Sequence, residues 1–218
     1  MCYPTKLLKK LKDLDTDNQL DFTQINKAIY WARKYHHGQV RKSGEPFYTH
    51  PLEVAYMLSD YKLKTDVIVT AILHDIVEDT EVTAGMILDN FSWRIAEMVD
   101  RLTRDRPDGS KLSVEEILNN AYEKDDKEVL LIKQFDRIHN INTLGVKSSK
   151  KIQATIKETL EVFLVFTMYQ EIPKLIRNLT ISCESHLGHN LSCQQPKIFF
   201  TDNFQLPFPV LKSDEYQT

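Results

Sequence analysis

The most restrictive feature of this chain is an apolar run that is interrupted by ionisable side chains. Residues 67–77 read VIVTAILHDIV. Apolar residues fall on nearly every side of such a helix, which is typical of a helix inside a core. The run contains His74 and Asp75, and Glu78 and Asp79 follow directly. Burying an ionised carboxylate is strongly unfavourable unless a partner compensates it. We therefore expect a compensating group opposite these side chains.

The rest of the sequence predicts an all-α fold. Only six glycines occur in 218 residues, and apolar residues recur at intervals of three and four. Ser113 and Glu116 form a capping-box pattern, and Pro51 stands where the first turn of a helix tolerates proline. Strand signals are nearly absent before IFF at 198–200. We expect helices near residues 22–36, 51–61, 65–79, 84–90, 92–104, 114–122, 126–143 and 149–170.

The composition changes after Tyr169. The segment that follows gains Pro, Asn and Ser and loses helical periodicity. We therefore expect a compact multi-helix bundle over residues 1–170. For residues 171–218 we expect a poorly structured C-terminal extension, either loosely packed or disordered.

Charge and cysteine content limit the class of partner and the compartment. The chain has 28 Lys and Arg against 31 Asp and Glu, a net charge of −3, so we expect no DNA, RNA or membrane partner and only a local anion site. Three scattered cysteines and the lack of a signal-peptide run favour the cytoplasm. The apolar run LEVFLVFTMY is about half a membrane span, so we interpret it as a core helix. The oligomeric state cannot be read from the sequence.

Two predicted helices carry polar side chains in directions that can converge. On an ideal helix with His74 at zero, Glu78 lies at about 40°, Asp75 at about 100° and Asp79 at about 140°, which is one broad face. On the helix predicted over 126–143, the side chains of one narrow band span about 60°. These are Asp136, Asn140 and Thr143.

The residue types in these bands favour a divalent metal site. Two imidazoles, His50 and His74, and two carboxylates, Asp75 and Asp136, supply a mixed nitrogen and oxygen set that leaves coordination positions for water. Each of them alone is more often a structural residue. Together they favour the metal site, because three segments place polar residues where the apolar pattern forbids them. We expect His139 to form hydrogen bonds in the core rather than to bind metal.

Three blocks, GQVRKSGEPFYTHP, LHDIVEDT and DRIHNINTL, occur in this order. They resemble the HD-domain hydrolases of the Rel/Spo alarmone family, which include the hydrolase half of bifunctional (p)ppGpp synthetase/hydrolases and the stand-alone metazoan SpoT homologues. The match covers roughly residues 22–160. The resemblance implies an all-helical HD-type metal-dependent phosphohydrolase domain over residues 1–170. Its reaction would be hydrolysis of guanosine 3′,5′-bis(diphosphate) (ppGpp) and the pentaphosphate form (pppGpp) at the 3′ position, releasing pyrophosphate and GDP or GTP.

The resemblance also implies roles for individual residues. The chain has Gln134 and Phe135 where the family usually has an apolar and a small residue before the aspartate, so we expect different packing behind Asp136. The implied roles are one Mn²⁺ bound by His50, His74, Asp75 and Asp136; a catalytic acidic pair, Glu78 and Asp79; nucleotide contacts from Arg41, Lys42 and Ser43; and a ribose and base pocket lined by Asn140 and Thr143.

The mechanism that follows is a hypothesis with open alternatives. A divalent cation lowers the pKa of its bound water, and an acidic pair one turn away can accept and donate protons. Which acid does which cannot be read from the sequence. One alternative is a catalytically degenerate module that binds the nucleotide for regulation. Another is an HD phosphatase that acts on a different nucleotide, such as NADPH.

A second metal pattern near the C-terminus is weaker. Cys183, His186, His189 and Cys193 are zinc-type ligands, but their spacing is tighter than in usual finger patterns. Surface histidines and inert thiols are the preferred interpretation of these four residues.

Overall fold

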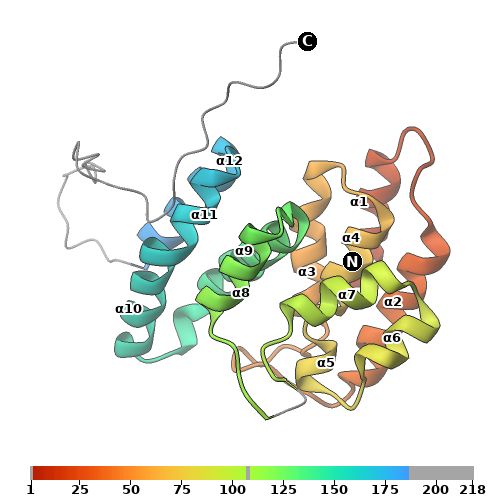
Figure 1. The fold of residues 1–218 in the computed structure, drawn as a ribbon, viewed down its shortest axis with the longest axis horizontal. Coiled ribbons are helices and arrows are strands. Elements are labelled where there is room, and N and C mark those ends of the chain that lie inside the picture. The colour runs from red at the N-terminus through yellow and green to blue at the C-terminus, as the bar shows by residue number, and fades with distance from the viewer. Residues whose placement is uncertain (1, 107–108, 187–218) are drawn as a thin grey trace. The chain divides into compact units, whose positions relative to one another are not determined.

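The structure is a computed structural model that describes residues 2–106 and 109–186, and these residues form α-helices joined by short loops (Figure 1). This part of the chain contains no strand, and the all-α prediction is confirmed. The helices are α1 (Tyr3–Leu14), α2 (Phe22–Tyr35), α3 (Thr49–Leu58), α4 (Thr65–Leu73), α5 (Ile76–Asp79), α6 (Ala84–Asn90), α7 (Trp93–Leu102), α8 (Val114–Glu123), α9 (Lys127–Asn142), α10 (Ser149–Glu158), α11 (Leu164–Tyr169) and α12 (Pro173–Glu184), with short 3₁₀ helices at Ser59–Tyr61 and Leu144–Val146 and a π-helix at Thr159–Phe163.

Helices α4 and α9 lie at the centre of the core. Every residue from Val67 to Leu73 in α4 is at most 1% exposed, as the all-round apolar pattern predicted. Helix α4 contacts α2, α3 and α7, while α9 contacts α3, α7, α8 and α12. The first polar band thus directly follows one enclosed helix, and the second lies on another. A polar side chain on either helix is consequently held in a fixed place by its neighbours.

Local capping signals set several helix starts. Ser113 and Glu116 form the predicted capping box at the start of α8, with each side chain accepting a hydrogen bond from the backbone N–H of the other residue. Asp21 caps α2 by accepting from the backbone amides of Thr23 and Gln24. The apolar run LEVFLVFTMY lies in the π-helix and α11, where Phe163 and Phe166 are buried. Among the helices of the described residues, none has both the length and the apolarity that crossing a bilayer requires.

The helix predicted over 65–79 is interrupted at the residues of interest. Helix α4 ends at Leu73, α5 begins at Ile76, and His74 and Asp75 occupy the turn between them. The ring of His74 bonds to the carbonyl of Ala71 at 2.8 Å. That carbonyl is the acceptor that the amide of Asp75 would use in a continuous helix. The ideal-helix angles expected for the four polar residues are therefore only approximate.

The sequence prediction was wrong for residues 173–184. They were placed in a loosely packed extension, but they form α12, which packs against α9 and α11. Leu175, Leu179 and Cys183 are at most 1% exposed and recur every four residues, an apolar stripe that Asn and Ser residues between them obscure. Residues 187–218, with IFF at 198–200, His189 and Cys193, lie outside the described residues. The division between a hydrolase domain over 1–170 and an extension over 171–218 otherwise remains a prediction, as does the interpretation of Cys183, His186, His189 and Cys193 as inert thiols and surface histidines.

Candidate metal centre and basic cleft

Three distant segments bring candidate metal ligands together. His50 in α3, His74 at the end of α4 and Asp136 in α9 are buried, and each offers a ligand atom within 4.8 Å of the other two. Asp75 joins them from the α4–α5 turn, with carboxylate oxygens 3.1 Å from Nε2 of His74 and 3.4 Å from Nε2 of His50. Asp75 does not belong to the group whose ligand atoms all lie within 4.8 Å of one another. The structure thus places all four predicted ligands at one point, three of them tightly.

Each of the two histidines is oriented by a second hydrogen bond. Nδ1 of His74 lies 2.8 Å from the carbonyl oxygen of Ala71, and since a carbonyl only accepts, Nδ1 donates. When the ring is neutral, the lone pair of Nε2 therefore points into the cluster, where that buried atom has no hydrogen-bond partner among the described residues. Nδ1 of His50 lies 2.8 Å from Nδ1 of His139. Metal-binding histidines typically show this second contact, so the pair fits a divalent cation.

The charges at this point favour a cation. Burial lowers the pKa of His74, but the adjacent Asp75 carboxylate outweighs burial and raises the pKa to about 9. Burial raises the pKa of Asp136, yet Lys133 and His50 bring it below the ordinary value. Nζ of Lys133 lies 3.2 Å from Oδ2 of Asp136. The two carboxylates thus attract positive charge beyond that of Lys133, which a proton on His74 supplies in the metal-free protein and which a divalent cation could supply in its place.

Lys133 was missed in the sequence analysis. It precedes Asp136 by one helical turn, and its side chain is only 8% exposed. A lysine inside the buried stretch VLLIKQF was the available signal, because an interior lysine requires an anionic partner.

The predicted acidic pair lies on α5, beside the metal ligands. Glu78 lines the same cavity as His50, and its Oε2 accepts a hydrogen bond at 3.2 Å from the backbone amide of Arg104. Asp79 is not among the residues that line this cavity. Partial burial and the carboxylates of Asp75 and Glu78 raise the pKa of Asp79 to about 6. Sequence reasoning did not single out Arg104.

Two adjoining cavities lie beside the candidate metal ligands. The first, of about 480 Å³, is lined by His50, Asp75, Glu78, Asp136 and Asn140 among others. The second, of about 540 Å³, is lined by Lys42, Ser43 and Thr143 among others. Four residues line both: Arg41, Phe47, Lys147 and Lys151. The predicted nucleotide-contacting residues therefore lie next to the predicted metal ligands in space.

Arg41 is held against α9 by the predicted polar band. One guanidinium nitrogen donates to Oδ1 of Asn140 at 2.9 Å and to Oγ1 of Thr143 at 3.4 Å, and the other lies 3.2 Å from Nδ1 of His139. Asn140 in turn donates to Oδ1 of Asp136 at 2.5 Å. Hydrogen bonds thus connect the basic loop to the metal-site carboxylate. The loop turns at Gly44, whose φ of +89° favours glycine, and the amide of Gly44 donates to the carbonyl of Arg41.

A cluster of cations in this cleft has no anionic partner. Arg41, Lys42, Lys147 and Lys151 form no ion pair with a carboxylate in the part of the chain that the structure describes. Burial and the neighbouring charges of Lys151, Arg41 and Lys42 lower the pKa of Lys147. Unpaired cations gathered at one place favour an anionic ligand. Lys147 and Lys151 were missed, although KSSKK at 147–151 is a basic run directly after Thr143.

Two further residues of α9 have contacts within the bundle, and the hydrogen bonds expected for His139 are present. Arg137 forms an ion pair with Glu158 at 2.7 Å and lies 4.2 Å from the ring centre of Phe163, so it is a structural residue of the bundle. Nδ1 of His139 lies within hydrogen-bond distance of Arg41 and His50. Burial, His50 and Arg41 lower the pKa of His139 to about 3, so the ring is neutral at ordinary pH.

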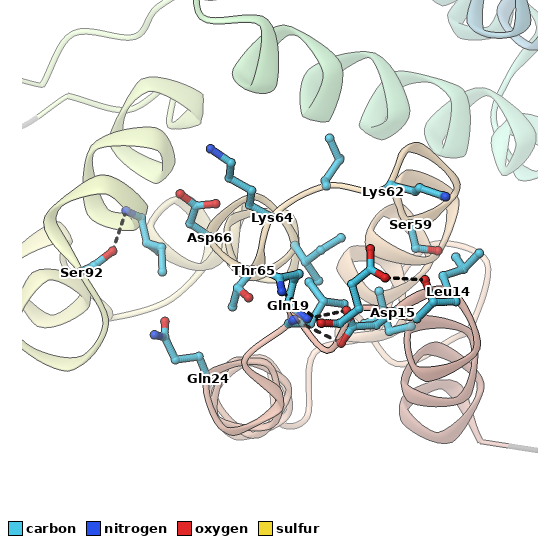
Figure 2. Close-up of a pocket in the computed structure, with 17 residues that line it drawn as sticks. Leu14, Asp15, Gln19, Gln24, Ser59, Lys62, Lys64, Thr65, Asp66 and Ser92 are labelled. Atoms are coloured by element: carbon cyan, nitrogen blue, oxygen red, sulfur yellow. Dashed lines mark hydrogen bonds between the residues drawn. The ribbon is translucent and has the colours of Figure 1, made fainter.

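A groove outside this region has a different character (Figure 2). It encloses about 640 Å³ between the end of α1, the loop to α2 and the starts of α4 and α7, and none of the predicted site residues lines it. Of its three acidic residues, Asp15 already accepts hydrogen bonds from the backbone amides of Gln19 and Leu20, and Asp66 pairs with Arg94. Among the described residues, the group that could hold a metal ion includes no residue of this groove.

Comparisons with known proteins agree with this geometry. The chain is 38% identical over 151 residues to a GTP pyrophosphokinase of Myxococcus xanthus, covering 66% of this chain and 20% of that protein. It is 34% identical over 147 residues to the bifunctional (p)ppGpp synthase/hydrolase SpoT of Escherichia coli strain K12, covering 64% and 21%. The chain thus spans about a fifth of the length of these curated relatives.

A solved structure shares the fold. It is that of a metazoan ortholog of SpoT that hydrolyzes ppGpp and plays a role in starvation responses, with a TM-score of 0.62 and 21% identity over 76% of this chain and 96% of that one. The HD domain family matches residues 28–169, a range that includes the histidines and aspartates of the metal centre. With the helices, the clustered ligands and these relatives in agreement, the chain belongs to the HD domain family.

Proposed function

We propose that this chain is a Mn²⁺-dependent hydrolase that removes pyrophosphate from the 3′ position of ppGpp and pppGpp, leaving GDP and GTP. One observation carries the proposal: two imidazoles and two carboxylates gathered at one point, suited to a divalent cation, adjoin a cleft with unpaired cations, suited to a polyphosphate. The relatives named for (p)ppGpp hydrolysis support the choice of substrate.

The metal would be held by His50, His74, Asp75 and Asp136. This set combines two imidazoles with two carboxylates, which suits Mn²⁺ and leaves positions for water. The bound cation would supply a water molecule of lowered pKa and would stabilise charge on the phosphate. The outer hydrogen bonds of His50 and His74 support their assignment as ligands, because they present Nε2 to the cluster.

The acidic pair would handle the protons of hydrolysis. The oxygen of water bonds to the 3′ phosphorus, the bond from phosphorus to the 3′ oxygen breaks, and that oxygen leaves as the ribose hydroxyl. Glu78 and Asp79 would take the proton from water and supply one to the leaving oxygen. The raised pKa of Asp79, about 6, suits a group that exchanges a proton near neutral pH.

The cleft would bind the rest of the nucleotide. Arg41 and Lys42 would contact phosphate, Arg41 as a planar fork and Lys42 as a point charge. Ser43, Asn140 and Thr143 would supply hydrogen bonds to the nucleotide. Lys147 and Lys151 add charge from the far wall of the same cleft.

A turnover assay with matched arms tests the proposal. The purified full chain is incubated with Mn²⁺ and ppGpp, and the released pyrophosphate and GDP are measured by anion-exchange chromatography. We expect turnover that stops on chelation and is absent in Asp75→Ala, which also loses Mn²⁺ binding in calorimetry. Binding of ppGpp without turnover would instead indicate a degenerate regulatory module. Phosphate release from NADPH without ppGpp turnover would indicate a phosphatase for another nucleotide.

A further inference from the structure

His139 contacts both halves of the candidate site through one atom. The residue lies on α9, one turn after Asp136, and its ring centre is 4.7 Å from that of His50. Nδ1 of His139 is 2.8 Å from Nδ1 of His50 and 3.2 Å from a guanidinium nitrogen of Arg41. A candidate metal ligand and a candidate phosphate-binding residue therefore share a single ring nitrogen.

The direction of these hydrogen bonds follows from the donors available. A guanidinium nitrogen can only donate, so Nδ1 of His139 is an acceptor and carries no proton. The short contact between the two Nδ1 atoms then requires that His50 donates. With its proton on Nδ1, His50 has a bare Nε2, and this atom lies 3.2 Å from Asp136 and 3.4 Å from Asp75. The tautomer that a metal ligand needs is thus imposed by the lone pair of His139.

We propose that His139 is a positioning residue that orients His50 for metal binding and Arg41 for phosphate binding through the same lone pair. This inference rests on the proposed function for its phosphate half, whereas its metal half stands on the geometry alone. Arg41 also bonds to Asn140 and Thr143, so the loss of one of three contacts weakens its placement without freeing it. His50 lacks such additional contacts, because its Nδ1 makes its hydrogen bond to His139. Removing the acceptor should therefore weaken metal binding more than it weakens phosphate binding.

Two substitutions separate positioning from packing. His139→Asn keeps an acceptor, the amide oxygen, close to the place of Nδ1 but removes the ring. His139→Phe keeps a ring of similar size but removes the acceptor. If His139 only fills space, the Phe substitution should have a small effect on Mn²⁺ affinity and the Asn substitution a large one. If His139 is a positioning residue, the Asn substitution should have the small effect and the Phe substitution the large one.

The first readout is the affinity for Mn²⁺ alone, measured by calorimetry on the chelator-treated full chain without nucleotide. We expect the Asn variant to stay within about threefold of the wild type and the Phe variant to bind 10–100-fold more weakly, the usual effect of losing an outer-shell partner. The second readout is KM for ppGpp, which should rise in the Phe variant only. Thermal unfolding of each metal-free variant reports whether it is folded.

The Asn variant keeps the proposal falsifiable even if the Phe variant does not fold. A folded Asn variant that loses tenfold or more in Mn²⁺ affinity would overturn the proposal, as would equal affinities in the two variants. If the chain proves not to hydrolyse ppGpp at all, the Mn²⁺ titration still decides the metal half. The failure of the proposed function and the failure of this inference are therefore distinguishable.

Discussion

Asp79 is in an environment that opposes its ionisation. Partial burial and the carboxylates of Asp75 and Glu78 raise its pKa to about 6, against an ordinary value of 3.8. Between these two pH values the folded chain binds more protons than the unfolded chain. The free energy of unfolding therefore falls as pH rises through this window. Above pH 6 the folded chain carries an ionised Asp79 and has lost this part of its stability.

We predict that Asp79→Asn stabilises the metal-free protein above pH 6 while it abolishes turnover. Asn resembles the protonated acid, so the two proteins should unfold at similar temperatures near pH 4 and diverge above pH 6. Asp79 is only partly buried and much of its side chain is exposed to solvent, which screens the repulsion. The rise in Tm should therefore be a few degrees at most. Thermal scans of both chelated proteins across this range measure the difference. A variant that is less stable than the wild type at pH 7.5 contradicts the assigned environment.

Gln134 is a second residue whose surroundings do not suit it. It is fully buried on α9, and neither its amide nitrogen nor its amide oxygen has a hydrogen-bond partner among residues 2–106 and 109–186. An unpaired buried polar group typically costs about 1–3 kcal/mol. The following residue, Phe135, packs its ring against Tyr61.

We predict that Gln134→Leu raises the free energy of unfolding by about 1 kcal/mol, because an apolar side chain of similar size needs no partner. In a chain of this size the gain corresponds to a rise in Tm of about 2–4 °C. Gln134→Asn is the matched control, since it keeps the amide and leaves a void, and it should destabilise. Denaturant unfolding of the wild type and the two variants measures these differences in stability. A less stable Leu variant would show that a buried water molecule satisfies the amide.

At this scale the sequence predicted which residues would lie together, but not how each of them is hydrogen bonded. The motifs pointed to His50, His74, Asp75 and Asp136, and the structure brings them to one place. The carbonyl of Ala71 and the ring of His139, which orient the two histidines, could not be identified from the sequence. They depend on contacts from other parts of the fold, and a residue type does not specify which of its atoms is hydrogen bonded.

Among the elements, α10 contributes the part of the cleft that sequence reasoning overlooked. Lys147 precedes this helix and Lys151 lies in its first turn, and both line the two cavities that meet at Arg41. The start of a helix also carries partial positive charge, so the same element attracts an anion through its backbone. The next lysine, Lys150, is exposed and lines neither cavity.

We predict that Lys147→Ala and Lys151→Ala each raise KM for ppGpp by roughly 3–10-fold with little change in kcat. A charged partner in a partly solvated cleft contributes on the order of 1 kcal/mol, and salt screens it. The effect should therefore shrink as NaCl rises from 50 to 500 mM, values chosen to bracket a Debye length of about 10 Å. Lys150→Ala is the control and should behave as the wild type. If all three variants match the wild type, the phosphate does not bind along α10.

The elements themselves were largely predictable, and the misses have physical causes. Continuous apolar periodicity marked α2, α7 and α9 with boundaries close to those observed. The break between α4 and α5 arises from a side chain that takes a backbone acceptor, which periodicity does not register. Helix α12 was missed because its apolar stripe is narrow and obtains its stability from packing against α9.

Across the whole molecule, the core and the candidate site are built on the same helices. Helix α9 carries Asp136 on one side and packs against α3, α7, α8 and α12 on its others. A contact that holds α9 therefore also holds the candidate metal ligand Asp136, even where the contact lies far from that residue. The free energy of unfolding and the affinity for the metal should therefore change together when a helix that packs against α9 is altered.

This coupling leads to a prediction about where the chain can be shortened. The boundary expected at residue 170 would remove α12, whereas a boundary after residue 186 keeps every described residue. Burying a leucine contributes about 1.5–3 kcal/mol, and α12 buries Leu175 and Leu179. Losing them removes a large share of a total stability of about 5–15 kcal/mol. We expect 1–170 to unfold at a much lower temperature and to bind Mn²⁺ more weakly than 1–186.

Two substitutions in the full chain separate the buried side of α12 from its exposed side. Leu179→Ala should reproduce part of both effects, with a loss of about 2–5 kcal/mol in the free energy of unfolding. Ile181→Ala, on the exposed side of α12, should reproduce neither effect. Calorimetric unfolding and Mn²⁺ titration of the same four samples test the coupling. A 1–170 chain as stable as 1–186 would show that α12 does not support α9.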